Sequence, residues 1–168
     1  MRGRLACLAL FVGLAACTPQ YDWREVEVAE GRAHAAFPAK TQTQQRPVML
    51  AGTELPFTLT MARKDSIVFA VGHTVLPSGD AAAADALAQA LMQSWYVNTG
   101  ANPPAAPPQL GQTVDLVSSL RGVSLRFMAR AIVHDGALIE AIVTGPSEQF
   151  PQAPADEFLQ SLRPRPVR

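Results

Sequence analysis

The sequence predicts an α+β fold, an antiparallel β-sheet of about six strands with helices packed on it. Much of the chain after residue 23 alternates apolar and polar side chains with a period of two, which is typical of half-buried strands. Residues 80–97 break this pattern and are rich in Ala, Leu and Gln, which favour helix. A short apolar stripe over residues 155–162 predicts a second helix near the C-terminus.

The first half of the chain contains the clearest strand patterns. Residues 54–63 place apolar side chains on one face and Thr58 and Thr60 on the other. Residues 66–72 follow after a polar Lys-Asp pair, so the two segments predict a hairpin. Residues 67–71 are almost entirely apolar, as expected for a central strand covered on both faces. Arg24–Val28 and Arg32–Phe37 are also candidate strands, and Thr43–Leu50, interrupted by Pro47, is a weaker one.

The long predicted helix has recognisable ends. Ser78 or Asp80 is suited to cap its start, and Gly100 follows its end. The apolar side chains on one stripe are Ala84, Leu87, Ala88, Leu91 and Trp95. We expect this stripe to pack on the sheet; lining a ligand pocket is the alternative use of such a surface.

The segment "ANPPAAPPQLG", residues 101–111, contains four prolines. Proline lacks a backbone N–H and restricts the residue before it, so this segment cannot form a regular helix or an inner strand. We expect either a plain surface loop or a loop that contacts a partner. Docking of the segment itself into an aromatic groove is the alternative.

Residues 123–133 and 137–143 predict a second hairpin. We expect a three-residue loop, 134–136, with Gly136 in the left-handed conformation. In this register Ala131 faces Ile139, and Arg130 faces Glu140 on the more polar side of the sheet. A slip of one residue would bury the charges. In the predicted register the residue numbers of two paired residues add up to 270, as for Ala131 and Ile139. Pairs whose numbers add up to 271 would therefore contradict this prediction.

The N-terminus has the features of an export signal. Arg2 and Arg4 precede an apolar run, 5–16, that is too short to cross a bilayer comfortably. The run ends in Leu14-Ala15-Ala16-Cys17, which resembles the bacterial lipobox. That resemblance implies removal of residues 1–16 and attachment of acyl chains such as palmitate to Cys17. The alternative is a plain signal peptide followed by a chance cysteine.

Composition and charge limit the possible functions. Removing residues 1–16 leaves 152 residues with twelve basic and fourteen acidic side chains, a formal charge of about −2. This charge argues against nucleic acid as a partner. Cys7 lies in the leader and Cys17 would carry lipid, so the exported part has no disulfide. We therefore expect a lipid-modified residue and short tether over 17–22, one α+β domain over 23–164 and a basic tail over 165–168.

The order of these segments is similar to that of the PsbP/Mog superfamily, which includes DcrB-like bacterial lipoproteins. An early strand pair ends at "FPAK", the strands "LPFTLTMAR" and "SIVFAVG" precede a helix, and a long hairpin precedes "FLQSLRP". The resemblance implies an α/β/α sandwich with varied binding and accessory roles. The proline-rich loop departs from that pattern. By a similar resemblance, Thr18 after the lipidated cysteine implies export to the outer membrane, facing the periplasm.

The sequence contains little that indicates catalysis. His34, His73 and His134 fall on different predicted elements, without the spacing of metal ligands. The nucleophile elbow, the P-loop and the dinucleotide fingerprint are missing. We therefore expect no metal and no cofactor. His73, at the end of a strand, and Ser78 are the remaining candidates for a reactive site.

Three functions follow from these observations. The leading hypothesis is a non-enzymatic, membrane-anchored envelope lipoprotein that binds another protein. The second is a carrier of a lipid or other apolar small molecule in a pocket between helix 80–97 and the sheet. The third is a small enzyme that uses His73 or Ser78. The candidate partner contacts are Trp23, Tyr96, Pro103, Pro104, Pro107 and Pro108.

Overall fold

The computed structural model describes residues 20–78, 80–120 and 122–166. The predicted leader, Cys17 and the last two residues of the predicted tail lie outside the described residues. No helix in the described part of the chain is both long and apolar enough to span a lipid bilayer.

The described chain forms a six-stranded antiparallel sheet with the strand order β3-β4-β5-β8-β7-β6. A smaller sheet has the order β1-β2-β9. The strands are β1 (Arg24–Val28), β2 (Ala33–Phe37), β3 (Gln42–Leu50), β4 (Thr53–Lys64), β5 (Ile67–Val75), β6 (Thr113–Leu120), β7 (Val123–His134), β8 (Ala137–Pro146) and β9 (Arg163–Pro164). The helices are α1 (Ala81–Thr99), α2 (Gln152–Ser161) and the 3-10 turns η1 (Ala29–Gly31) and η2 (Ser147–Gln149).

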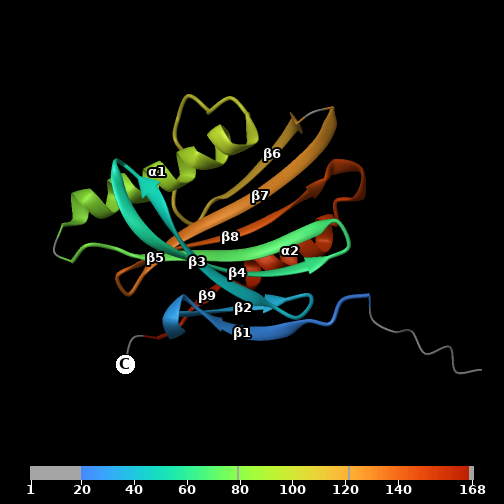
Figure 1. Cartoon of the computed structure of the whole chain (residues 1–168), viewed down its shortest axis with the longest axis horizontal. Helices are drawn as coiled ribbons and strands as arrows, with labels where there is room; N and C mark the ends of the chain where they lie inside the picture. Colours follow the sequence, from blue (N-terminus) through green and yellow to red (C-terminus); the bar gives the residue numbers. More distant parts are fainter. Residues whose placement is uncertain (1–19, 79, 121, 167–168) are drawn as a thin grey trace, which may run out of the picture.

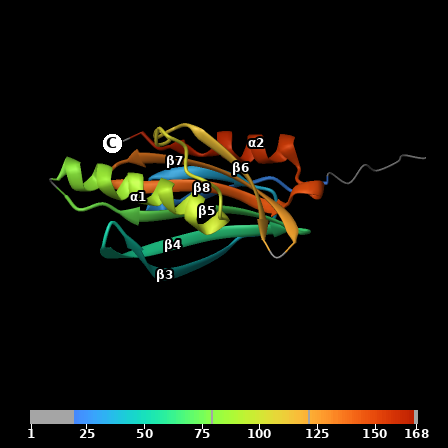
Figure 2. The same cartoon turned by 90° about the horizontal axis from the view of Figure 1, so that it is seen from above.

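The elements form three layers (Figures 1 and 2). Helix α1 covers one face of the large sheet, while α2 and the small sheet cover the other face. On the second face, the rings of Phe37 and Phe69 pack edge-to-face against Phe158, with centroids 5.1 and 5.4 Å apart. The predicted α+β architecture, an antiparallel sheet with helices packed on it, is confirmed.

The ends of α1 agree with its sequence. A side-chain oxygen of Asp80 accepts a 2.9 Å hydrogen bond from the backbone N–H of Ala83, so Asp80 is the N-cap. Gly100 ends the helix with φ of 72°, in the left-handed region that favours glycine. The buried side chains on the helix are Leu87, Ala88, Leu91, Met92, Trp95 and Tyr96. The predicted stripe therefore packs on the sheet.

The predicted register of the β7–β8 hairpin is wrong. Ala131 pairs with Glu140, and His134 pairs with Ala137, so the residue numbers of paired residues add up to 271 instead of 270. Asp135 and Gly136 form a two-residue turn with φ of 46° and 68°, as a type I′ turn requires. The prediction assumed that Glu140 avoids the core. Instead β8 is central and covered on both faces, and Glu140 is buried beneath α1.

Two further segments differ from the expectations. Strand β6, at the edge of the sheet, was not predicted. At the C-terminus, the Arg163–Pro164 strand pairs with β2. Arg165, expected to begin a basic tail, donates its backbone N–H to the carbonyl of Arg32 over 2.8 Å. Its guanidinium donates to the Glu27 carboxylate over 2.6 Å. These bonds attach the end of the described chain to the small sheet.

Candidate functional site

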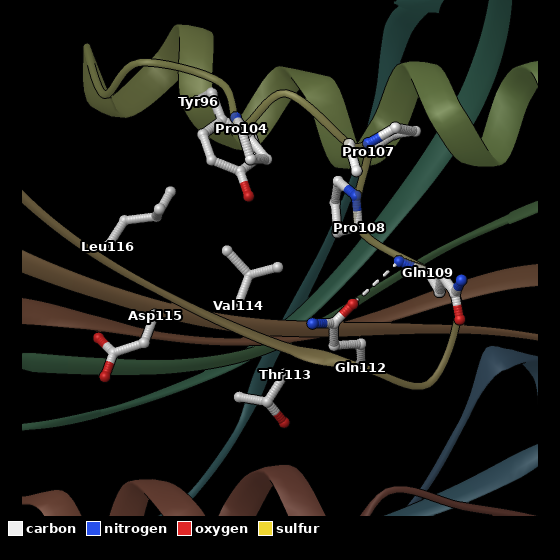
Figure 3. Close-up of a pocket in the computed structure, with 11 residues that line it drawn as sticks. Tyr96, Pro104, Pro107, Pro108, Gln109, Gln112, Thr113, Val114, Asp115 and Leu116 are labelled. Atoms are coloured by element: carbon white, nitrogen blue, oxygen red, sulfur yellow. Dashed lines mark hydrogen bonds between the residues drawn. The ribbon is translucent and has the colours of Figure 1, made fainter.

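A surface pocket of about 390 Å³ lies where α1, the proline-rich loop and β6 meet (Figure 3). We call it the loop–β6 pocket. Tyr96 contributes from α1, and residues 113–116 contribute from β6. The loop residues that line it are Pro104, Ala106, Pro107, Pro108, Gln109 and Gln112. Three segments that are separate in the sequence thus form one concave site.

Tyr96 occupies the wall that α1 provides. The residue is only 6% exposed, because its ring belongs to the apolar face of the helix that packs on the sheet. Its hydroxyl points toward β6, and none of the other residues drawn in Figure 3 forms a hydrogen bond with it. The sequence left open whether Tyr96 faces outward; the ring is buried and the hydroxyl remains available to a ligand.

The proline-rich loop is held at its base by a turn. The backbone N–H of Gln112 donates to the carbonyl of Gln109 over 3.1 Å, and the side-chain oxygen of Gln112 accepts from the Gln109 backbone over 3.2 Å (Figure 3). Gly111 then donates to the carbonyl of Ala131 on β7 over 2.7 Å. Pro108 is buried, whereas Pro104 and Pro107 are exposed. The loop is therefore tied to the sheet at one end and presents prolines to solvent.

Strand β6 supplies the floor and a free edge. Consecutive strand residues point to opposite faces, yet all four residues from Thr113 to Leu116 line the pocket. The pocket therefore follows the backbone of β6. Among the described residues, β6 pairs only with β7. The opposite edge strand, β3, contains Pro47, which limits pairing there, while β6 has no proline.

The pocket carries little uncompensated charge. Asp115 is the charged residue in its lining. The guanidinium of Arg126, on β7, donates to Asp115 through Nε over 2.9 Å and also through Nη2. This ion pair raises the pKa of Arg126. The rest of the lining consists of proline rings, aliphatic groups, hydroxyls and amides, which suit an uncharged ligand group.

The structure brings together four of the six contact residues that the sequence suggested: Tyr96, Pro104, Pro107 and Pro108. Pro103 is exposed but does not line the pocket. Trp23 lies on the opposite side of the large sheet, where it stacks on Tyr21 with ring centroids 5.8 Å apart and meets the edge of Phe69. The sequence reasoning missed the β6 residues, although the alternation of Val114 and Leu116 with polar neighbours indicates a strand.

The two candidates for catalysis do not form a reactive pair. His73 is 6% exposed on β5, and burial lowers the pKa of its imidazole. Ser78 is exposed in the segment before α1, and no hydrogen bond joins it to His73 in the described part of the chain. Nor do any three His, Cys, Asp or Glu side chains of residues 20–78, 80–120 and 122–166 come together as metal ligands.

Comparisons with known proteins leave the site to be interpreted from its geometry. No protein-family model matches the chain, and a search of curated proteins finds no relative. The likeness to the PsbP/Mog superfamily therefore stays a prediction from the order of the segments.

Proposed function

We propose that this protein is a membrane-anchored envelope lipoprotein whose folded part binds an extended segment of a partner protein at the loop–β6 pocket. The observation that carries the proposal is that residues 113–116 of β6 line the pocket, and that β6, among the described residues, pairs only with β7. An edge strand offers backbone N–H and C=O groups that an incoming strand satisfies, and an adjacent pocket selects one of its side chains.

The chemistry of the lining suggests which side chain enters. Because Arg126 neutralises Asp115, a charged group would lose its hydration without gaining a free counter-charge. The prolines and the aliphatic part of β6 favour an apolar or aromatic side chain. The Tyr96 hydroxyl then provides one directional contact. The occupant is thus an extended, uncharged peptide segment of another protein.

The predicted anchor is consistent with such a role. The lipobox resemblance at 14–17 implies a lipid on Cys17, and two or more acyl chains hold a protein stably on a bilayer. The five residues from Thr18 to Asp22 span at most about 17 Å when extended. The folded part would therefore stay close to the membrane, where envelope proteins are concentrated.

The packing gives less support to the other two functions. A carrier needs space between α1 and the sheet, but Leu91, Met92 and Trp95 are each at most 3% exposed in that layer. They pack with Leu138 and Ala131 from the central strands. An enzyme needs a nucleophile beside a base, and Ser78 and His73 lack that contact.

Site-specific photo-crosslinking tests the partner proposal. A photoreactive phenylalanine analogue replaces Ala106, which is exposed and lines the pocket, in the full chain in its native membrane. The matched control replaces Gln44, which is exposed on the opposite edge strand, β3. We expect a partner crosslinked through a single segment from position 106 and not from position 44.

A second variant ties the crosslink to the β6 edge. Thr113→Lys places a charge at the pocket and the free edge, so it should reduce crosslinking at position 106 at least tenfold, while Gln44→Lys should not. A synthetic peptide of the crosslinked segment should shift the backbone amide signals of β6. Equal products at positions 44 and 106, or a peptide that leaves the β6 amides unchanged, would overturn the proposal.

The anchor requires its own test. The full chain should incorporate radiolabelled palmitate, and the Cys17→Ala variant should not. Equal labelling of both chains would contradict attachment at Cys17.

A further inference from the structure

A second pocket, of about 400 Å³, lies on the face of the large sheet opposite α1. Its floor comes from β3, β4 and β5, and its rim comes from η1 and the end of β1. The residues that line it are Glu27, Val28, Ala29, Glu30, Thr43, Gln45, Thr58, Thr60 and His73. We call it the His73 pocket. It shares no residue with the loop–β6 pocket, and the inference below does not depend on the proposed function.

His73 has unused hydrogen-bonding capacity at a buried position. Its side chain contributes to the floor, and the residue is only 6% exposed. Neither ring nitrogen forms a hydrogen bond with another described residue. Burial lowers the pKa of His73, so its imidazole is uncharged at neutral pH, with one donor and one acceptor nitrogen. In the described part of the chain only Oγ1 of Thr74 is fully buried without a partner, so the ring nitrogens of His73 are accessible from the pocket and can contact a ligand there.

The neighbours of His73 form a polar row across three strands. Gln45 on β3 pairs with Thr58 on β4, and Thr58 pairs with His73 on β5. Beside this row, the hydroxyls of Thr43 and Thr60 hydrogen-bond to each other over 3.1 Å. Hydroxyls, an amide and a neutral imidazole all lie on the same face, and each can donate and accept. The floor therefore offers several bidirectional hydrogen-bonding groups and no charge.

The rim has strained backbone and compensated charges. Ala29 and Glu30 both have φ of 54°, in the left-handed region that costs energy for residues other than glycine. Arg32 supports this turn, because its guanidinium donates to the Glu30 carboxylate over 2.7 Å. Glu27 is paired with Arg165 over 2.6 Å. Strained backbone of this kind is concentrated at ligand sites, and here Ala29 and Glu30 belong to the lining of the His73 pocket.

We propose that the His73 pocket binds a small, uncharged, polyhydroxylated molecule of the monosaccharide class. Sugar hydroxyls donate and accept at once, which matches the floor of Thr58, Gln45 and His73. The lining offers an anion no cationic side chain. A cation would find the rim carboxylates of Glu27 and Glu30 already paired with arginines. Neutral, multiply hydroxylated ligands satisfy the floor without either conflict.

Ligand titration with the full chain in detergent micelles tests the proposal by NMR. The probes are glucose, galactose and N-acetylglucosamine, with glucosamine and glucuronate as their cationic and anionic counterparts. We expect saturable shifts of the His73 ring signals and the Thr58 amide with at least one neutral sugar. Shifts that never saturate, or that arise only with the charged sugars, would overturn the assignment.

A conservative variant links the shifts to the pocket. Thr58→Val keeps the shape of the side chain and removes its hydroxyl, so it should weaken sugar binding at least tenfold. Thr53→Val is the matched control, since Thr53 is exposed on the same strand and does not line the pocket. Unchanged affinity in Thr58→Val would overturn the proposal. Because Thr58 is only partly buried, its variant should fold, and an unchanged amide spectrum away from the pocket verifies this.

Discussion

The indole Nε1 of Trp95 donates a 2.7 Å hydrogen bond to Oε2 of Glu140, and this bond joins α1 to the central strand β8 inside the core. Trp95 is 2% exposed and Glu140 is 5% exposed. Burial raises the pKa of Glu140 to about 7, against the opposing effects of the Trp95 hydrogen bond and the Arg46 charge. The packing of the helix on the sheet is therefore coupled to the protonation of one carboxyl group.

The first prediction concerns the pH dependence of stability. The folded state holds a proton on Glu140 up to about pH 7, whereas the unfolded chain releases it near its ordinary pKa of 4.5. The free energy of unfolding should therefore fall as pH rises from about 4.5 to 7 and level off above, a loss of about 3 kcal/mol from this group. Urea unfolding of the wild type and of Glu140→Gln across this pH range measures the loss. Parallel pH profiles for the two proteins would contradict the prediction.

The second prediction concerns the donor in this pair. Trp95→Phe keeps an aromatic ring and removes the N–H, so the pKa of Glu140 should rise further. We expect a loss of about 1–3 kcal/mol in the free energy of unfolding. The loss should be larger at pH 8 than at pH 5, because removing the N–H donor costs more when the carboxylate is ionised than when it is protonated. Tyr96→Phe is the control, since no described residue bonds to its hydroxyl. An equal loss in both variants would show that the indole N–H is unimportant.

The third prediction concerns the close approach that makes room for this pair. Gly72 lies directly opposite Glu140 on β5. A Cβ at position 72 would collide with the Phe57 ring and lie 2.9 Å from Oε1 of Glu140. Gly72→Ala should therefore lower the free energy of unfolding by about 1–3 kcal/mol. Calorimetry should show that the Gly72→Ala/Phe57→Leu double variant loses less free energy of unfolding than the two single variants lose together.

The fourth prediction tests the left-handed conformation of Gly136 in the turn of the β7–β8 hairpin. Gly136 has φ of 68°, and a Cβ there would meet nothing within 4 Å. Any effect of Gly136→Ala thus comes from the backbone alone, and we expect a loss of about 1 kcal/mol. Gly136→Asn should cost less, because asparagine tolerates the left-handed conformation. Thermal unfolding that ranks the alanine variant at or above the asparagine variant would argue against this conformation of Gly136.

Local patterns predicted much of the fold and part of the site. The segment 54–63 and the helix from residue 80 contain enough alternation or helix-forming residues to identify their elements without knowledge of the rest. Tyr96 and three prolines of the 101–111 loop lie at one pocket because the helix end and the loop are adjacent in the sequence. Trp23 lies on the other side of the large sheet, and an aromatic side chain does not reveal from the sequence which side it packs on.

The sequence alone determined where the chain alternates, where α1 begins and ends, and where prolines prevent regular structure, because these properties depend on neighbouring residues. Only the tertiary structure decided which residues of the neighbouring strands pair with each residue of β8. It also decided that β6 lies at an edge of the sheet, and it placed Gln45, Thr58 and His73 in one row. A glutamate such as Glu140 normally indicates a solvent-exposed position. Its burial becomes acceptable only when Trp95, far away in the sequence, donates a hydrogen bond to its carboxyl group. Long-range contacts of this kind leave no local periodicity from which they could be predicted.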